Sequence, residues 1–423
     1  AEWLAWQETL HPSRVDLRLE RVREVWARLY PKLAAGALPF PVITVGGTNG
    51  KGSCVAYLEA WYRAAGYRCG AYTSPHLLQY NERVRIDGPM VSDADLCAAF
   101  ARIDQTRGES LLTYFEFGTL AALDLFVRAD IDIAVLEVGL GGRLDAVNLI
   151  DADVSVVVSI GHDHAAWLGS ELDQIAFEKA GIFRPGRAAV IGQRDAPPRL
   201  RARAQELGAQ PLQLGQEFDW AAETGQWRWR GPSGKAFRAL PAPALRGRRQ
   251  YDNAAAALCA MVQLSDRLPV NLAAIRKGLL RLKLAGRFTV LPGRPTWVLD
   301  VAHNDQAALA LAENLAGYPC AGRRVAVLSL LADKDASAVI GPLSGLIERW
   351  HLAVSESERA MPVEQLSMAL AEAAPTAHSV QHPDLDHALS AAAAEAAPED
   401  LVLVFGSFMT VEAALRSPIV ATV

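Results

Sequence analysis

A lysine and a hydroxyl residue lie within one glycine-rich run, Gly46 to Ser53. Its glycines allow several backbone N–H groups to surround one anion. Lys51 would add a point charge for the β- and γ-phosphates of a nucleotide, and the Ser53 hydroxyl would bind Mg²⁺. The run departs from G-x-x-x-x-G-K-[ST], because Val45 replaces the first glycine and Gly52 separates Lys51 from the hydroxyl. A glycine-rich turn without a ligand is the alternative, but this composition favours a phosphate loop.

Two elements would position this loop. Val42 to Val45 is a short apolar run typical of a buried strand, and a helical pattern follows from about Cys54 to Ala65. The loop would therefore lie at a helix N-terminus, where backbone amides and the helix dipole favour phosphate.

Acidic and histidine residues follow two further apolar runs. Ile131 to Leu136 ends in Glu137, and Val154 to Ile160 ends in Gly161-His162-Asp163-His164. Ligands of open α/β sheets gather at the carboxyl ends of the strands. We therefore expect Glu137 to bind Mg²⁺ and not to be a chance strand-end acid. The histidines could suit zinc, but their oxygen-rich neighbours suit Mg²⁺ better.

The alternation of apolar strands and helical stretches predicts an α/β protein of two domains. We expect residues 1–285 to form a mostly parallel sheet flanked by helices, with a small β-rich insert around Trp227-Arg228-Trp229. After a hinge at Leu284 to Phe288, residues 286–423 would form a smaller Rossmann-like domain. Its first strand would be Trp297 to Val301.

Two stretches at the ends of the chain read as helical. Residues 1–40 carry an apolar stripe at helical spacing, and residues 374–399 are rich in alanine and acids, typical of a surface helix. The former would pack on the sheet.

The composition excludes several classes of protein. A net charge of −5 over 423 residues, without a polybasic patch, argues against nucleic acid or membrane surfaces as partners. We find neither an apolar run of membrane-span length nor a signal peptide. The five cysteines are scattered and are expected to be reduced core thiols. We expect a cytoplasmic monomer.

The chain resembles the bifunctional dihydrofolate synthase/folylpolyglutamate synthases of the Mur ligase superfamily in several segments that occur in the family's order. These segments are Gly47-Thr48-Asn49-Gly50-Lys51-Gly52-Ser53, Thr73-Ser74-Pro75-His76-Leu77, Tyr80-Asn81-Glu82-Arg83-Val84, Leu136 to Ala146, Glu178-Lys179-Ala180-Gly181-Ile182-Phe183 and Asp300-Val301-Ala302-His303-Asn304. The resemblance covers nearly the whole chain, which makes it specific.

The resemblance implies an ATP-dependent amide ligase that uses one or two Mg²⁺ ions. Its substrates would be L-glutamate with 7,8-dihydropteroate or reduced folates. A substrate carboxylate would attack the γ-phosphate of ATP, giving an acyl phosphate and ADP, and the amine of glutamate would then form the amide. Lys179 would be carbamylated by CO₂, which turns an ammonium into a carboxylate-like metal ligand.

The resemblance also assigns roles by position. ATP would be bound by Thr48, Asn49, Gly50, Lys51, Gly52, Ser53, Asn253, Arg287 and Asp300. The metal ligands would be Ser53, Ser74, Glu137, His164 and, at a second ion, Lys179. Lys51, Lys179 and His303 would be catalytic. Pteroate or folate would contact Glu20, Arg21, Val22, Arg83, Thr113, Tyr114, Phe115, Glu116, Leu144, Asp145 and Ala146. Asp300 and His303 would line a cleft between the domains.

Each assigned residue also has an ordinary structural interpretation. These are a turn cap for Ser74, a solvated charge for Arg83, an exposed helix cap for Glu116, a helix-dipole partner for Lys179, a helix-start residue for Asn253 and a helix N-cap for Asp300. His162 and Met409 depart from the family pattern and stay unassigned. No residue stands out as the base for the incoming amine.

Three other functions stay open. A Mur-type ligase acting on a cell-wall precursor would need a nucleotide-sugar-binding domain, for which too few residues precede the phosphate loop. A purely polyglutamylating enzyme is harder to exclude, although the segment Leu144 to Ala146 favours the bifunctional type. A nucleotide-gated interaction protein would not need Glu116, Lys179 or the Asp300 segment.

Overall fold

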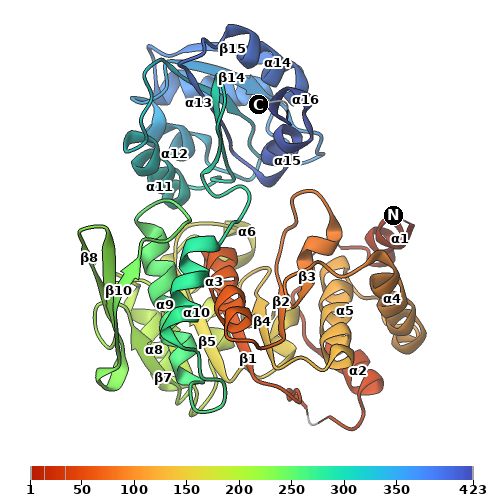
Figure 1. Cartoon of the computed structure of the whole chain (residues 1–423). Helices are drawn as coiled ribbons and strands as arrows, with labels where there is room; N and C mark the ends of the chain where they lie inside the picture. The colour runs from red at the N-terminus through yellow and green to blue at the C-terminus, as the bar shows by residue number, and fades with distance from the viewer. Residues whose placement is uncertain (1, 14, 34, 422–423) are drawn as a thin grey trace. The chain divides into compact units, whose positions relative to one another are not determined.

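The computed structural model describes residues 2–13, 15–33 and 35–421. This part of the chain divides into two compact units, drawn in Figure 1. The first comprises the residues up to His76, Tyr80–Ala244 and Gln250–Leu282, and the second comprises Leu77–Gln79, Leu245–Arg249 and the residues from Lys283 onward. The division after Leu282 lies close to the predicted limit between residues 285 and 286.

The main sheet of the first unit has the strand order β3-β2-β4-β1-β5-β6-β7 and is parallel except for β3, which pairs antiparallel with β2. Its strands are β1 (Val42–Gly46), β2 (Cys69–Tyr72), β3 (Val84–Ile86), β4 (Ile133–Glu137), β5 (Val154–Val157), β6 (Ala188–Ile191) and β7 (Gln210–Gln213). The central strands are buried along their whole length, as expected for a parallel sheet covered on both faces.

Helices cover this sheet, and α3 lies beside α10 in Figure 1. The helices of the unit are α1 (Glu2–Leu10), α2 (Glu20–Leu29), α3 (Lys51–Ala64), α4 (Asp93–Arg107), α5 (Tyr114–Ala129), α6 (Ala165–Leu168), α7 (Leu172–Lys179), α8 (Pro198–Glu206), α9 (Arg249–Gln263) and α10 (Leu272–Arg281). Short 3₁₀ helices lie at Tyr80–Arg83, Ala146–Leu149, Ala180–Ile182 and Pro232–Gly234.

The predicted β-rich insert is a small antiparallel sheet with the order β10-β9-β8. Its strands are β8 (Asp219–Glu223), β9 (Gln226–Arg230) and β10 (Ala236–Pro241). Trp227 and Trp229 are buried while their neighbours in β9 are exposed, which is the period-two pattern of a strand with one covered face.

The second unit is a smaller α/β body with the strand order β11-β12-β16-β13-β14-β15. All neighbouring pairs are parallel except β11 with β12. The strands are β11 (Thr289–Leu291), β12 (Thr296–Asp300), β13 (Arg324–Leu328), β14 (Arg349–Ala353), β15 (His378–His382) and β16 (Leu401–Phe405). The helices are α11 (Asp305–Ala316), α12 (Ala336–Ile340), α13 (Val363–Ala373), α14 (Leu385–Glu395), α15 (Phe408–Arg416) and α16 (Pro418–Ala421), with a 3₁₀ helix at Gly341–Leu343. The predicted Rossmann-like architecture is confirmed.

Two stretches differ from the prediction. Residues 1–40 are not one continuous helix, because α1 ends at Leu10 and α2 begins at Glu20 and ends at Leu29. Residues 374–399 contain the edge strand β15 before α14, and α14 buries one of its faces. The prediction of a single surface helix is therefore wrong. No helix in the described ranges is long and apolar enough to cross a membrane.

The cysteine prediction holds in part. Each of the five cysteines, all within the described residues, is a free thiol. Cys54, Cys69 and Cys259 are buried as predicted, but Cys97 is exposed and Cys320 is half-buried.

Candidate active site

The phosphate loop connects β1 to α3, as the sequence predicts. Its glycines are required by geometry, because Gly47 and Gly50 have φ values of 143° and 84°. A Cβ on Gly50 would lie 2.5 Å from the Asn253 side-chain oxygen and 2.9 Å from a methyl of Val158. The loop therefore packs directly on the first part of α9, and Asn253 is buried against it. Asn253 is more than a helix-start residue.

Two lysines converge on one carbonyl of this loop. Lys51 Nζ donates to the oxygens of Gly47 and Thr48, each at 3.1 Å, and Lys179 Nζ donates to the Gly47 oxygen at 3.1 Å. Lys179 is only 4% exposed. Burial lowers the pKa of Lys179 to about 7, and the nearby Lys51 charge acts in the same direction. Lys179 is therefore poised to lose its proton near neutral pH, unlike an ordinary helix-dipole lysine.

The metal ligands predicted for the first ion come from four segments of the first unit: Ser53 in α3, Ser74 after β2, Glu137 at the end of β4 and His164 after β5. Glu137 ends β4 and is buried, and its Oε2 accepts a hydrogen bond from the Ser74 N–H at 3.2 Å. The buried Ser53 Oγ in α3 has no hydrogen-bond partner among the described residues. His164 lies after β5 with a φ of 53°, and its N–H donates to Asp163 at 2.8 Å. Hydroxyl and carboxylate oxygens suit Mg²⁺.

A divalent ion at these residues would not be held by a dedicated protein cage. In the described part of the chain, no three His, Cys, Asp or Glu side chains form a cluster that could hold a metal. A buried hydroxyl with no partner among the described residues fits an ion that completes its shell with water and nucleotide phosphate.

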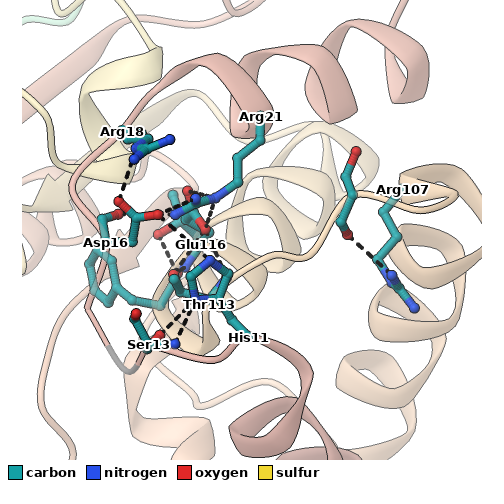
Figure 2. Close-up of polar contacts among 11 residues, drawn as sticks. His11, Ser13, Asp16, Arg18, Arg21, Arg107, Thr113 and Glu116 are labelled. Atoms are coloured by element: carbon teal, nitrogen blue, oxygen red, sulfur yellow. Dashed lines mark hydrogen bonds and ion pairs between the residues drawn. The ribbon is translucent and has the colours of Figure 1, made fainter.

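Glu116 is buried and paired, so its interpretation as an exposed helix cap is wrong. It completes a capping box at the start of α5, in which it accepts from the Thr113 N–H at 2.8 Å while Thr113 Oγ1 accepts from the Glu116 N–H. Figure 2 shows its second partner, Arg21, whose Nε lies 2.9 and 2.8 Å from the two carboxylate oxygens. The predicted segments 20–22 and 113–116 are thus brought together.

Asp16 is part of this cluster and carried no signal in the sequence. It accepts from Arg21 Nη1 at 2.6 Å, and its carbonyl accepts from Nη2 at 3.0 Å (Figure 2). The hydrogen bonds from Arg21 lower the pKa of Asp16. An irregular segment with one acid offers no periodicity from which this contact could be read.

Arg83 is buried, which overturns its interpretation as a solvated charge. Its guanidinium lies over the rings of Tyr80 and Tyr114, 5.2 and 5.5 Å from the two centroids. Its Nε donates to His76 Nδ1 at 2.9 Å. Burial lowers the pKa of His76 to about 4, and the charge of Arg83 acts in the same direction, so His76 serves as a neutral acceptor.

The remaining predicted substrate residues surround a glycine-rich turn after β4. A Cβ on Gly139 would lie 2.5 Å from the Phe115 ring, so only glycine fits there. Buried Asp145 accepts from the N–H groups of Leu140 at 2.8 Å and Val147 at 2.9 Å. Burial raises the pKa of Asp145 to about 6. Asp145 thus holds the turn in shape. Leu144 and Ala146 flank it.

The second unit carries Arg287, Asp300 and His303. Asp300 ends β12 and accepts from the N–H groups of Phe288 at 2.7 Å and Ala302 at 2.8 Å. Burial raises the pKa of Asp300. The N-cap of α11 is Asn304, so the interpretation of Asp300 as a helix cap is wrong.

The other two residues flank it. His303 Nδ1 hydrogen-bonds the Val301 oxygen at 2.7 Å, and the Arg287 guanidinium lies 5.4 Å from the Phe408 ring centroid. Met409 follows in α15, whose N-cap is Ser407.

Comparisons with known proteins agree with these observations. Residues 45–261 match the Mur ligase middle domain, and residues 286–408 match the Mur ligase glutamate ligase domain. A dihydrofolate synthase/folylpolyglutamate synthase of Escherichia coli is 42% identical over 97% of this chain and 93% of its own. Escherichia coli FolC in complex with DHPP and ADP superposes with a TM-score of 0.91, at 41% identity, over 98% of this chain and 96% of that one.

A third comparison concerns a structure with a metal. The bifunctional enzyme of Yersinia pestis, complexed with AMPPNP and Mn, superposes with a TM-score of 0.89 at 42% identity, covering 98% of each chain.

Proposed function

The chain belongs to the Mur ligase family and, within it, to the dihydrofolate synthase/folylpolyglutamate synthases, and from this premise we propose that it joins L-glutamate to 7,8-dihydropteroate and to reduced folates. It is an ATP-dependent ligase. The observation that supports a chemical reaction at the phosphate loop is that Lys51 and Lys179 both donate to the Gly47 carbonyl. A loop that only binds and releases nucleotide does not require a second, buried lysine with a pKa lowered to about 7.

The first step joins two anions, a substrate carboxylate and a triphosphate. A carboxylate oxygen forms a bond to the γ-phosphorus, and the bond from that phosphorus to the oxygen that bridges it to the β-phosphate breaks. ADP departs, and the substrate is left as an acyl phosphate. Lys51 and the first N–H groups of α3 offset the repulsion, because they present positive charge where the phosphates would lie. Mg²⁺, when bound, supplies further charge neutralisation at the phosphates.

The second step forms the amide. The glutamate amine attacks the acyl carbon, the carbon–oxygen bond to phosphate breaks, and the amine loses a proton as the tetrahedral species collapses. Water must be excluded while the acyl phosphate exists. We propose that His303 acts at this stage and that Arg287 and Asp300 contact ATP, by analogy with the family.

We propose that Ser53, Ser74, Glu137 and His164 hold one Mg²⁺ and that a carbamylated Lys179 serves a second ion. The unpartnered Ser53 hydroxyl supports the first assignment, and the complex of the Yersinia pestis relative with Mn and AMPPNP supports a divalent ion beside the nucleotide. For Lys179, the neutral amine that its low pKa makes available forms a bond to CO₂ and loses a proton. The product would carry a negative charge, which removes the repulsion with Lys51.

We propose that the pteroate or folate substrate lies against the segments joined through Glu116 and beside the turn held by Asp145. The complex of the Escherichia coli relative with DHPP supports this class of substrate. The partners assigned to the pocket are Glu20, Arg21, Val22, Arg83, Thr113, Tyr114, Phe115, Glu116, Leu144, Asp145 and Ala146. Asp145 holds that turn through the N–H groups of Leu140 and Val147.

The test is ADP release by the purified chain with Mg²⁺-ATP and L-glutamate, with and without 7,8-dihydropteroate, followed by mass spectrometry. ADP formation that requires dihydropteroate and glutamate, with a product one glutamyl unit heavier, establishes the first activity. Tetrahydrofolate in place of dihydropteroate tests the second activity. ADP formation with neither pteroate nor folate stimulation would overturn the substrate assignment, and stimulation by tetrahydrofolate alone would indicate a purely polyglutamylating enzyme.

A further inference from the structure

The segment that follows β5 holds the first half of the phosphate loop. The Thr48 N–H donates to the Ser159 carbonyl oxygen at 2.8 Å. The Ser159 hydroxyl accepts from the Asn49 N–H at 3.0 Å and donates to the Asn49 carbonyl at 3.0 Å. The Ser159 side chain thus hydrogen-bonds both the backbone N–H and the backbone carbonyl of Asn49.

Thr48 completes this attachment with its own side chain. Its hydroxyl donates to the Gly161 oxygen at 3.1 Å and accepts from the Gly161 N–H at 3.0 Å. The N–H groups of Thr48 and Asn49 therefore point at the protein and not at a phosphate. The anion cradle is left to Gly50 and the first turn of α3, whose N–H groups have no acceptor within the helix.

The same segment is anchored on its other side and leads into the metal loop. The Ile160 N–H donates to the Gln193 side chain, which follows β6, at 2.7 Å. His164, a proposed metal ligand, lies three residues after Gly161. Residues 159–161 therefore hold the phosphate loop by hydrogen bonds and lead directly into the loop that carries His164.

We infer that Ser159 is a positioning residue of the nucleotide site, an inference that rests on the proposed ATP-dependent activity. Its hydroxyl touches no phosphate and orders the Thr48–Asn49 half of the loop before nucleotide arrives. Without the Ser159 hydroxyl, part of the loop would have to become ordered when nucleotide binds. This cost weakens the affinity for nucleotide but does not alter the groups that act in the reaction.

The experiment compares Ser159→Ala with Ser159→Thr, which keeps a hydroxyl, and with the matched control Ser155→Ala. Ser155 lies in β5, four residues before Ser159, and its hydroxyl donates to the Ile182 oxygen at 2.8 Å and not to Thr48 or Asn49. Mg²⁺-ADP binding is measured by calorimetry, and KM and kcat by ADP release. Unfolding of each ligand-free variant is followed by circular dichroism.

In Ser159→Ala we expect the Kd for Mg²⁺-ADP and the KM for ATP to rise about tenfold, which corresponds to about 1.4 kcal/mol. The kcat at saturating ATP and the KM for glutamate should change less than about twofold, and Ser159→Thr should restore most of the affinity. Unchanged ADP binding in Ser159→Ala, or an equal loss in Ser155→Ala, would overturn the inference. So would a fall in kcat with an unchanged KM.

Direct ADP binding also separates this inference from the proposed function. Ser159 could still position the loop if dihydropteroate failed to stimulate turnover, because the probe is the nucleotide alone. Conversely, normal ADP binding by Ser159→Ala would leave the ligase assignment intact.

Discussion

Lys51 and Lys179 share the Gly47 oxygen as an acceptor, so their amines lie close together. Two ammonium groups there repel one another, and Lys179 is also buried. Burial and the Lys51 charge together lower the pKa of Lys179 to about 7. A carbamate on Lys179 would go further and attract Lys51.

Lys179→Arg tests this chemistry at the level of one residue. Arginine keeps the positive charge and cannot be carbamylated or deprotonated in a protein. We expect kcat to fall about 100-fold, the order of loss seen when a positioned catalytic charge is removed, while Mg²⁺-ADP still binds. Turnover of the parent chain should rise with bicarbonate in CO₂-depleted buffer, and that of the variant should not. A variant with more than half of the parent's turnover would refute a catalytic role for this lysine.

Gln7 in α1 is a second residue with unusual surroundings. It is 1% exposed, and within the described chain neither its amide nitrogen nor its amide oxygen has a hydrogen-bond partner. An unpaired buried polar group costs roughly 1–3 kcal/mol. Gln7→Leu, which removes both polar atoms at similar volume, should raise the free energy of unfolding by about 1 kcal/mol or more in urea titrations.

Gln213→Leu is the matched control. Gln213 is also buried, but its amide donates to the carbonyls of Gln193 at 3.4 Å and Arg194 at 3.1 Å. Its replacement should therefore lower the free energy of unfolding. Destabilisation by Gln7→Leu would show that the amide has a partner in solution.

At the scale of elements, strong local signals gave correct predictions. The helix α4 shows such signals, because its N-cap Ser92 and its first-turn acids Asp93 and Asp95 are local features. Strands β1 and β4 lie where short apolar runs predicted them and are buried along their whole length, as parallel strands covered on both faces are.

The missed elements lack such signals. The strand β15 (His378–His382) is a half-exposed edge strand of polar residues, stabilised by pairing with β14 and not by an apolar face. The site was predicted as a set of residue types, but the Arg21–Glu116 contact joins residues 95 positions apart. A single sequence holds no periodicity that reports such a pair, and Ser159 was missed for the same reason.

Glu116→Gln tests the joint between α2 and α5. The change keeps the shape but leaves Arg21 facing a neutral group, and breaking a buried pair commonly costs about 3–5 kcal/mol. With part of the capping box retained, we expect a loss of about 2–4 kcal/mol in unfolding free energy and a higher KM for dihydropteroate. Glu24→Gln removes an exposed pair with Arg28 at 3.4 Å and should cost less than about 0.5 kcal/mol. Equal effects of the two changes would contradict the assigned role of Glu116.

Two parallel strands of the second unit carry a histidine pair that should make its stability depend on pH. His351 in β14 is buried, and its Nδ1 lies 2.9 Å from Nε2 of His382 in β15. Burial lowers the pKa of His351 to about 4, with the His382 charge adding to the effect. Glu395, paired with Arg349 at 3.2 Å, lies 3.5 Å from the other ring nitrogen.

The direction of the pH dependence follows from the linkage between proton binding and folding. Between pH 6.5 and 4 the unfolded chain binds more protons at this position than the folded chain, so stability falls as the pH is lowered through that window. We expect His351→Phe to lose less stability than the parent from pH 7 to 4, by about 1–3 kcal/mol. Urea unfolding at several pH values measures this, with the exposed His387→Phe as control. Parallel curves for His351→Phe and the parent would disprove it.

At the scale of the whole molecule, each unit has its own sheet and its own buried core. The phosphate loop, residues 159–161 that hold it and the proposed metal ligands all belong to the first unit. A chain of this kind need not unfold in one step. Nucleotide that binds only the folded state stabilises it by RT ln(1 + [L]/Kd), about 2.7 kcal/mol at 100 times the Kd.

A comparison of Gly50→Ala with Gly66→Ala separates the loss of stabilisation by bound nucleotide from the effect of backbone strain alone. Both glycines have positive φ, 84° and 95°, so both replacements strain the backbone by about 1 kcal/mol. A Cβ at Gly66 meets nothing within 4 Å, whereas one at Gly50 would strike Asn253 and Val158. In calorimetric melts we expect Mg²⁺-ADP to raise the transition of Gly66→Ala as in the parent and to leave that of Gly50→Ala nearly unchanged. An equal ADP-dependent rise in both variants would mean that nucleotide binds elsewhere than in this loop, because both changes strain the backbone but only Gly50→Ala places a Cβ against Asn253 and Val158.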